Sequence, residues 1–114
     1  MAIKDNFKKG SVELLVLAVL SKEDMYGYQI TQKIKEYSEG LFTVLEGSLY
    51  PILYRLSNEG YVTENTVAIK RRLRVYYHLE DAGRAYFEKC LDEYKSVNLG
   101  VEKVLNEVSN PSEK

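Results

Sequence analysis

The last third of the chain places the strongest limit on how it can fold. From Asp81 to about Val108 there is no proline, and apolar side chains recur at alternating steps of three and four residues, the spacing of a coiled-coil seam. Such a helix is roughly 42 Å long at about 1.5 Å per residue. The preceding residues form too small a domain to cover it, so the seam needs a second apolar surface, most simply another copy of the chain. The side chains expected to form this dimer contact are Leu91, Tyr94, Val101, Val104 and Leu105.

Three shorter helical patterns precede this segment. Residues 10–21 are apolar on most sides, which predicts a largely buried helix. A second helix is expected from about residue 26 to 37, with Gly40 as its stop signal. The third ends at Gly60 and carries an apolar stripe at the i, i+3, i+4, i+7 spacing, formed by Leu49, Ile52, Leu53 and Leu56.

Pro51 bears on where the third helix begins. Proline lacks an N–H and clashes with the carbonyl four residues earlier, so it is expected in the first helical turn. Ser48 as the N-cap satisfies that condition. A start near Leu45 is the alternative, and it would place Pro51 where it disturbs the hydrogen-bond ladder.

Two segments rich in β-branched and aromatic residues follow the third helix. Residues 60–66 and 73–79 are predicted to form an antiparallel hairpin. The residues between them contain no Asn-Gly or Gly-Gly pair, so we expect a longer, mobile tip. Three helices followed by a hairpin describe a winged helix-turn-helix, in the mainly α (α+β) class. Residues 1–79 would be the DNA-binding domain, and residues 80–114 the dimerisation helix with a frayed tail.

The third helix has a polar face opposite its apolar stripe. Tyr50 and Tyr54 lie on that side, with Ser48 and Arg55 on the flanks. In a helix-turn-helix the third helix buries one face and places the other in the DNA major groove. Hydroxyl groups and the arginine can reach phosphates, and Arg55 can also reach a guanine edge. In the alternative interpretation the tyrosines cover the edge of the core and Arg55 is solvated.

A basic cluster lies at the expected hairpin tip. The whole chain has a net charge of −1, but residues 1–79 hold 11 Lys and Arg against 9 Asp and Glu. On a winged helix these side chains would lie along the minor groove or the DNA backbone, adding affinity and salt dependence. The alternative is a solvated turn. The residues are Lys70, Arg71, Arg72 and Arg74.

The composition argues against several other classes of protein. Cys90 is the only cysteine and His78 the only histidine, so no disulfide, metal-ligand set or nucleophile–base pair is expected within one chain. The sequence therefore predicts no enzyme and no cofactor. Without a long apolar run or an apolar leader segment, it predicts a cytoplasmic protein with no membrane partner.

Four stretches resemble the PadR family of bacterial transcriptional regulators. They are KGSVELLVLAVL at 9–20, MYGYQI at 25–30, EGSLYPILYRLSNEGYV at 46–62 and RVYYHLEDAG at 74–83. The short subfamily, with one C-terminal helix, is the nearest match. The resemblance implies a homodimer that represses transcription from a palindromic operator and responds to small planar, aromatic or phenolic compounds. It also implies DNA contacts by Tyr28, Ser48, Tyr50, Tyr54 and Arg55.

The same resemblance places a ligand at the centre of the dimer, with Tyr94 as the flat aromatic that lines it. The expected lining is Val12, Leu15, Tyr94, Val97 and Val101. These residues could equally form a closely packed interface. A winged-helix module that contacts other proteins without specific DNA binding is the alternative function, because the fold alone does not exclude it.

Overall fold

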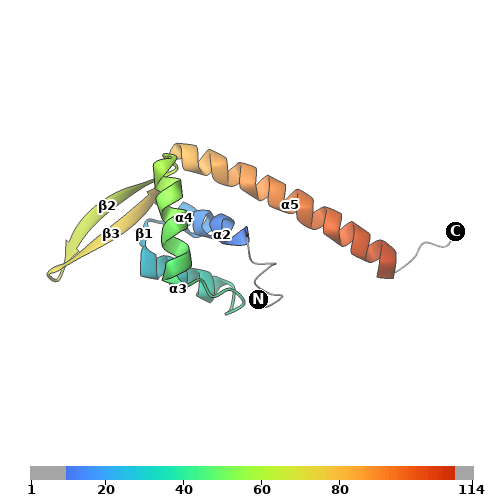
Figure 1. Ribbon diagram of the computed structural model, residues 1–114, viewed down its shortest axis with the longest axis horizontal. Helices are drawn as coiled ribbons and strands as arrows, with labels where there is room; N and C mark the ends of the chain where they lie inside the picture. The colour runs from blue at the N-terminus through green and yellow to red at the C-terminus, as the bar shows by residue number, and fades with distance from the viewer. Residues whose placement is uncertain (1–9, 110–114) are drawn as a thin grey trace.

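The computed structural model describes residues 10–109, which form four helices and a three-stranded sheet (Figure 1). The predicted fold class, a mainly helical winged helix-turn-helix with a long last helix, is confirmed. The expected frayed tail at residues 110–114 lies outside the described residues. In chain order the elements are α2 (Ser11–Lys22), β1 (Met25–Tyr26), α3 (Gly27–Tyr37), α4 (Glu46–Asn58), β2 (Val62–Ile69), β3 (Arg72–Leu79) and α5 (Asp81–Ser109).

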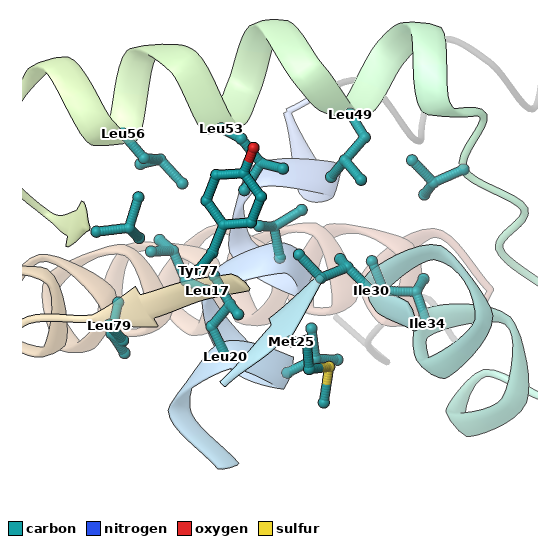
Figure 2. Close-up of a cluster of buried hydrophobic side chains, with 14 residues drawn as sticks. Leu17, Leu20, Met25, Ile30, Ile34, Leu49, Leu53, Leu56, Tyr77 and Leu79 are labelled. Atoms are coloured by element: carbon teal, nitrogen blue, oxygen red, sulfur yellow. The ribbon is translucent and has the colours of Figure 1, made fainter. Parts of the chain in front are cut away.

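One hydrophobic core holds α2, α3, α4 and the sheet together. The apolar stripe of α4 points into it, and Leu49, Leu53 and Leu56 are fully buried (Figure 2). They pack with Leu17 and Leu20 of α2 and with side chains from α3 and the strands. Burial of each such leucine contributes about 1.5–3 kcal/mol relative to exposure. The core therefore fixes the orientation of α4 and leaves its other side free.

The sheet has the strand order β1-β3-β2 and is antiparallel throughout. β1 was not expected from the sequence, since its two residues are too short for a periodic pattern. It pairs Met25 with Tyr77 and Tyr26 with Tyr76. This pairing ties the start of α3 to the base of the wing, which is the hairpin formed by β2 and β3.

The tip of the wing is tighter than predicted. β2 continues to Ile69 and pairs with Arg72, so only Lys70 and Arg71 form the turn. Both have positive φ, +46° and +68°, as in the type I′ turns whose twist matches the flanking strands. The expected long, mobile tip is wrong, because pairing of the full strands outweighs the cost of placing two non-glycine residues in the left-handed region, about 1 kcal/mol each.

Helix α4 begins earlier than the favoured N-cap, Ser48, would allow. Leu45 is the N-cap residue, and the backbone N–H groups of Ser48 and Leu49 donate to its carbonyl at 3.0 Å. Pro51 therefore lies inside the helix, so the prediction that it marks the first turn is wrong. Pro51 and Gly47 are both exposed, so water can bind the carbonyl that the proline leaves without an N–H.

Among the described residues, α5 packs on the winged domain mainly through its first turns. The Tyr86 ring stacks on Tyr61, with centroids 4.3 Å apart, and Gly83 is buried against the Tyr61 carbonyl. Every described residue from Asp92 onward is exposed, and the helix projects away from the core (Figure 1). The described chain therefore measures 69 × 29 × 22 Å. None of the helices within residues 10–109 is long and apolar enough to cross a membrane.

Candidate nucleic-acid interface

The outer face of α4 presents two tyrosines. Tyr54 is 73% exposed and Tyr50 44%, while the leucines on the opposite side are buried. Ser48 is exposed in the first turn of the helix. The structure thus separates a core face from a polar face, as the sequence pattern predicts, and the polar face contains Ser48, Tyr50 and Tyr54.

Tyr50 is held against the start of α3. Its hydroxyl lies where a Cβ would stand on Gly27, so a larger residue at position 27 would displace the ring. The hydroxyl donates to Glu46 Oε1 at 3.2 Å. Burial, together with the hydrogen bond to the Glu46 carboxylate, raises the pKa of Tyr50 above its usual value.

A hollow of about 280 Å³ lies between the starts of α3 and α4 and the inner part of the wing. Tyr28, which is exposed, and Tyr50 are both part of its wall. The residues that line the hollow include several tyrosines, which carry hydroxyl groups, and one arginine. The lining residues are Tyr26, Gly27, Tyr28, Glu46, Tyr50, Leu73, Arg74, Val75 and Tyr77.

The basic cluster is divided between two places on the wing. Lys70, Arg71 and Arg72 are exposed at the tip. Arg74 is half-buried nearer the base, and its guanidinium lies over the Tyr26 ring, 4.3 Å from the centroid. A cation over an aromatic face is favourable, so Arg74 has a preferred position, whereas the residues at the tip extend into solvent.

Arg55 points away from the other predicted contacts. Its guanidinium forms an ion pair with Glu13 of α2. The Tyr86 hydroxyl of α5 donates to the second oxygen of the same carboxylate at 2.5 Å. Glu13 raises the pKa of Arg55, and the hydrogen bond to Glu13 raises the pKa of Tyr86. The structure therefore groups Arg55 with α2 and α5, although its side chain is still 53% exposed.

The predicted dimer and ligand residues lie along α5 and α2. Leu91 is half-buried, whereas Tyr94, Val97, Val101, Val104 and Leu105 are exposed. Tyr94 and Val97 border a groove of about 310 Å³ between α2 and α5, together with Gly10, Ser11, Glu13, Leu14, Cys90 and Glu93. Within the described part of one chain, Tyr94 and Val97 are the predicted ligand residues that border this groove. Val12 packs against the core, and Leu15 borders a separate apolar hollow of about 270 Å³.

Comparison with known proteins agrees with this arrangement. The model of the transcriptional regulator PadR-like family matches residues 16–89, from the middle of α2 to the first turns of α5. The chain belongs to the PadR-like family. The resemblance seen in its four sequence stretches is thereby confirmed. Members of this family are transcriptional regulators rather than enzymes.

Several relatives of this PadR-like chain have names or structures. It is 29% identical over 79 residues to the transcriptional regulator Rv3488 of Mycobacterium tuberculosis, covering 69% of this chain and 71% of that protein. It is 31% identical over 83 residues to the negative transcriptional regulator PadR of Bacillus subtilis, covering 72% of this chain but only 46% of that protein.

Solved structures extend the comparison to the long helix. A PadR-like regulator from Bacillus cereus is 31% identical, with a TM-score of 0.75 over 88% of this chain and 96% of that one. A transcriptional regulator from Clostridium thermocellum is 26% identical, with a TM-score of 0.80 over 86% of this chain and 96% of that one. The structural likeness therefore extends beyond the winged domain into α5.

Sequence reasoning about this PadR-like chain missed residues whose roles depend on distant contacts. Glu46 and Gly27 help to position the polar face, because both contact the Tyr50 side chain. Glu13 and Tyr86 hold Arg55 and α5. Gly27 lies within the stretch MYGYQI that resembles the family, but that stretch alone did not indicate that the Tyr50 ring would lie against it. No local pattern indicated Glu13, because an acidic residue in the first turn of a helix is ordinary.

Proposed function

We propose that this chain is a DNA-binding transcriptional repressor that acts as a homodimer on a palindromic operator. The observation that carries the proposal is the single surface on which the polar face of α4 lies beside a basic wing. Ser48, Tyr50 and Tyr54 are on that helix, and Tyr28 lines the same hollow as Tyr50. A protein-interaction module has no need for cationic side chains beside such a face.

The two parts of this surface have different tasks. In a helix-turn-helix the N-terminal part of the third helix enters the major groove, where side chains reach base edges. Tyr50, Tyr54 and Ser48 can donate to phosphates or pack on thymine methyl groups. Lys70, Arg71, Arg72 and Arg74 would neutralise phosphates beside the groove, which adds affinity without reading sequence. Arg55 is already paired with a carboxylate on another helix, that of Glu13.

The second copy of the chain would cover the exposed seam of α5. Tyr94, Val101, Val104 and Leu105 are all exposed within the described chain, and apolar side chains at this spacing are typical of helix pairs. We assign residues 1–79 to DNA binding and residues 80–114 to dimerisation. The first turns of α5 also support the winged domain, because Gly83 and Tyr86 pack against it.

A small planar hydrophobic or phenolic compound is the proposed effector. The groove beside Tyr94 and Val97 provides an aromatic ring and an apolar wall within one chain. Val12, Leu15 and Val101 would complete the site only when a second copy is present. A planar dye should then change tyrosine fluorescence and raise the melting temperature, whereas no effect on either would count against an open site.

The function is tested by binding to a labelled fragment from upstream of the protein's own gene. We expect tight binding that weakens steeply between 50 and 200 mM salt, by about 10³-fold if six phosphates are contacted. A random duplex of equal length is the control. Equal affinity for both duplexes would contradict specific regulation and favour the protein-interaction module. Loss of repression of a reporter gene on deletion of the protein would support the repressor role.

A further inference from the structure

Glu13 connects three helices through one carboxylate. It lies in the first turn of α2, and its side chain is only 17% exposed. One oxygen forms the ion pair with Arg55 of α4, and the other accepts the hydrogen bond from Tyr86 of α5. The two partners come from the helix that carries the polar face and from the helix that carries the exposed seam. Glu13 is therefore a direct polar link between these two surfaces.

A second set of contacts joins the same elements. Tyr61 directly follows the turn that ends α4, and its ring stacks nearly parallel on Tyr86, with 9° between the planes. The backbone N–H of Glu80 donates to the Tyr61 carbonyl at 3.0 Å, and Gly83 packs on that carbonyl. The start of α5 is thus held at the end of α4 by the backbone, and Glu13 adds contacts to Arg55 of α4 and to the hydroxyl of the same Tyr86 whose ring stacks on Tyr61.

Two points of attachment restrict rotation between two helices, whereas one point leaves a hinge. The Tyr61 contacts fix where α5 begins. The Glu13 contacts to Arg55 and Tyr86 add a polar tie among α2, α4 and α5. The hydrogen bond from Arg84 to the Ser21 carbonyl and the packing of Phe87 on the core also hold the first turns of α5. Because hydrogen bonds and ion pairs of this kind are directional, they define an angle more sharply than apolar packing does.

The angle matters if the chain binds DNA as a dimer, so this inference rests on the proposed function. Successive base pairs are about 3.4 Å apart along the axis and roughly 35° apart around it. A small change in the angle between α4 and α5 would therefore bring the paired α4 helices to a different half-site spacing. We propose that the Glu13–Arg55–Tyr86 network is a positioning device that sets the half-site spacing the dimer accepts. Arg55 then acts through Glu13 and is a positioning residue.

Two variants of the full-length chain test this role. Tyr86→Phe keeps the ring stacked on Tyr61 but removes the hydroxyl that donates to Glu13. Glu13→Gln keeps an acceptor for Tyr86 but removes the charge that pairs with Arg55. The matched control is Glu36→Gln, which breaks the exposed ion pair between Glu36 and Lys33 on α3 and leaves the network intact. Circular dichroism and sedimentation establish that each variant is folded and has the wild-type oligomeric state.

Each protein is titrated against the operator recovered by selection from random duplexes, and against versions with one base pair added or removed between the half-sites. The wild type and Glu36→Gln should lose at least about 30-fold in affinity on either change, corresponding to about 2 kcal/mol. Tyr86→Phe and Glu13→Gln should lose less than about 3-fold, because their recognition helices can adjust. Their affinity for an isolated half-site should match the wild type.

The outcomes separate the inference from the function on which it rests. If both variants keep the wild-type spacing preference, the network does not position the helices. If they bind more weakly by one factor at every spacing and at the half-site, Arg55 contacts DNA or merely stabilises the fold. Selection that recovers no sequence with the wild type overturns the proposed function and this inference together.

Discussion

At the scale of single residues, Gly27 and Tyr50 show how one glycine can shape a surface. Gly27 is buried at the first position of α3, and the Tyr50 hydroxyl occupies the space next to its Cα. The ring can lie close to the backbone only because the residue has no side chain. The position of a hydroxyl on the proposed DNA-binding face thus depends on a residue in another helix.

Gly27→Ala should move Tyr50 and weaken operator binding by about tenfold, equivalent to the loss of one hydrogen bond of about 1.4 kcal/mol. Gly47→Ala is the stability control. Gly47 lies inside α4 with open space around it, so alanine there should raise the free energy of unfolding by about 0.5–1 kcal/mol. Chemical denaturation and DNA titration of both variants provide the measurement. Unchanged DNA affinity of Gly27→Ala would show that Tyr50 is not placed for contact.

At the scale of elements, the turn of the wing lowers the stability of the hairpin but places two positive charges at its tip. Lys70 and Arg71 occupy the left-handed positions that Asn and Gly fill most readily. Two long cations at the end of a regular hairpin therefore destabilise the turn while extending the basic surface. This opposition predicts that stability and DNA affinity change in opposite directions.

Lys70→Asn combined with Arg71→Gly should raise the free energy of unfolding by about 1 kcal/mol. The same variant should reduce the slope of log affinity against log salt by about 0.9 for each phosphate that the wing tip no longer neutralises. Lys89→Gln, on an exposed position of α5, controls for the removal of positive charge elsewhere. A salt slope equal to that of the wild type would remove the wing tip from the interface.

At the scale of the whole molecule, α5 is too long to be covered by the small winged domain. The winged domain covers one side of the first turns of this helix, and all described residues from Asp92 onward are exposed. Apolar groups on that part become buried only if another surface covers them. The proposed dimer would meet this requirement, and it would also bring together two α4 helices, each too short to read a long site.

Val101→Asp should convert the dimer to a monomer, because it places a carboxylate in the seam without touching the winged domain. Val101 is exposed in the single chain, so the monomer should keep its helical content. Operator affinity should fall by at least about 100-fold, since two half-sites would no longer be bound together. Sedimentation and DNA titration are the measurements, with Ser96→Asp on the other side of α5 as the control. A dimeric Val101→Asp protein would show that the seam is misplaced.

Much of the fold followed from periodicity, which is a local property. The stripe at Leu49, Leu53 and Leu56 predicted the buried face of α4, and the proline-free run after Asp81 predicted α5. The errors occurred at the ends of elements, whose positions depend on hydrogen bonds to neighbouring segments. Pairing along the whole of β2 and β3 closed the turn at Lys70 and Arg71, and hydrogen bonds to the Leu45 carbonyl started α4 before Ser48.

The sequence by itself determined the three helices, the hairpin and the long amphipathic helix, because these depend on spacing within one segment, and four of its stretches carried the resemblance to the family. Only the tertiary structure decided where Arg55 points. Its partner Glu13 lies on α2, and the Tyr86 hydroxyl that completes the group comes from 73 positions beyond Glu13. An ion pair forms between side chains that folding brings together, and no periodicity along the chain records which distant carboxylate a flanking arginine will meet.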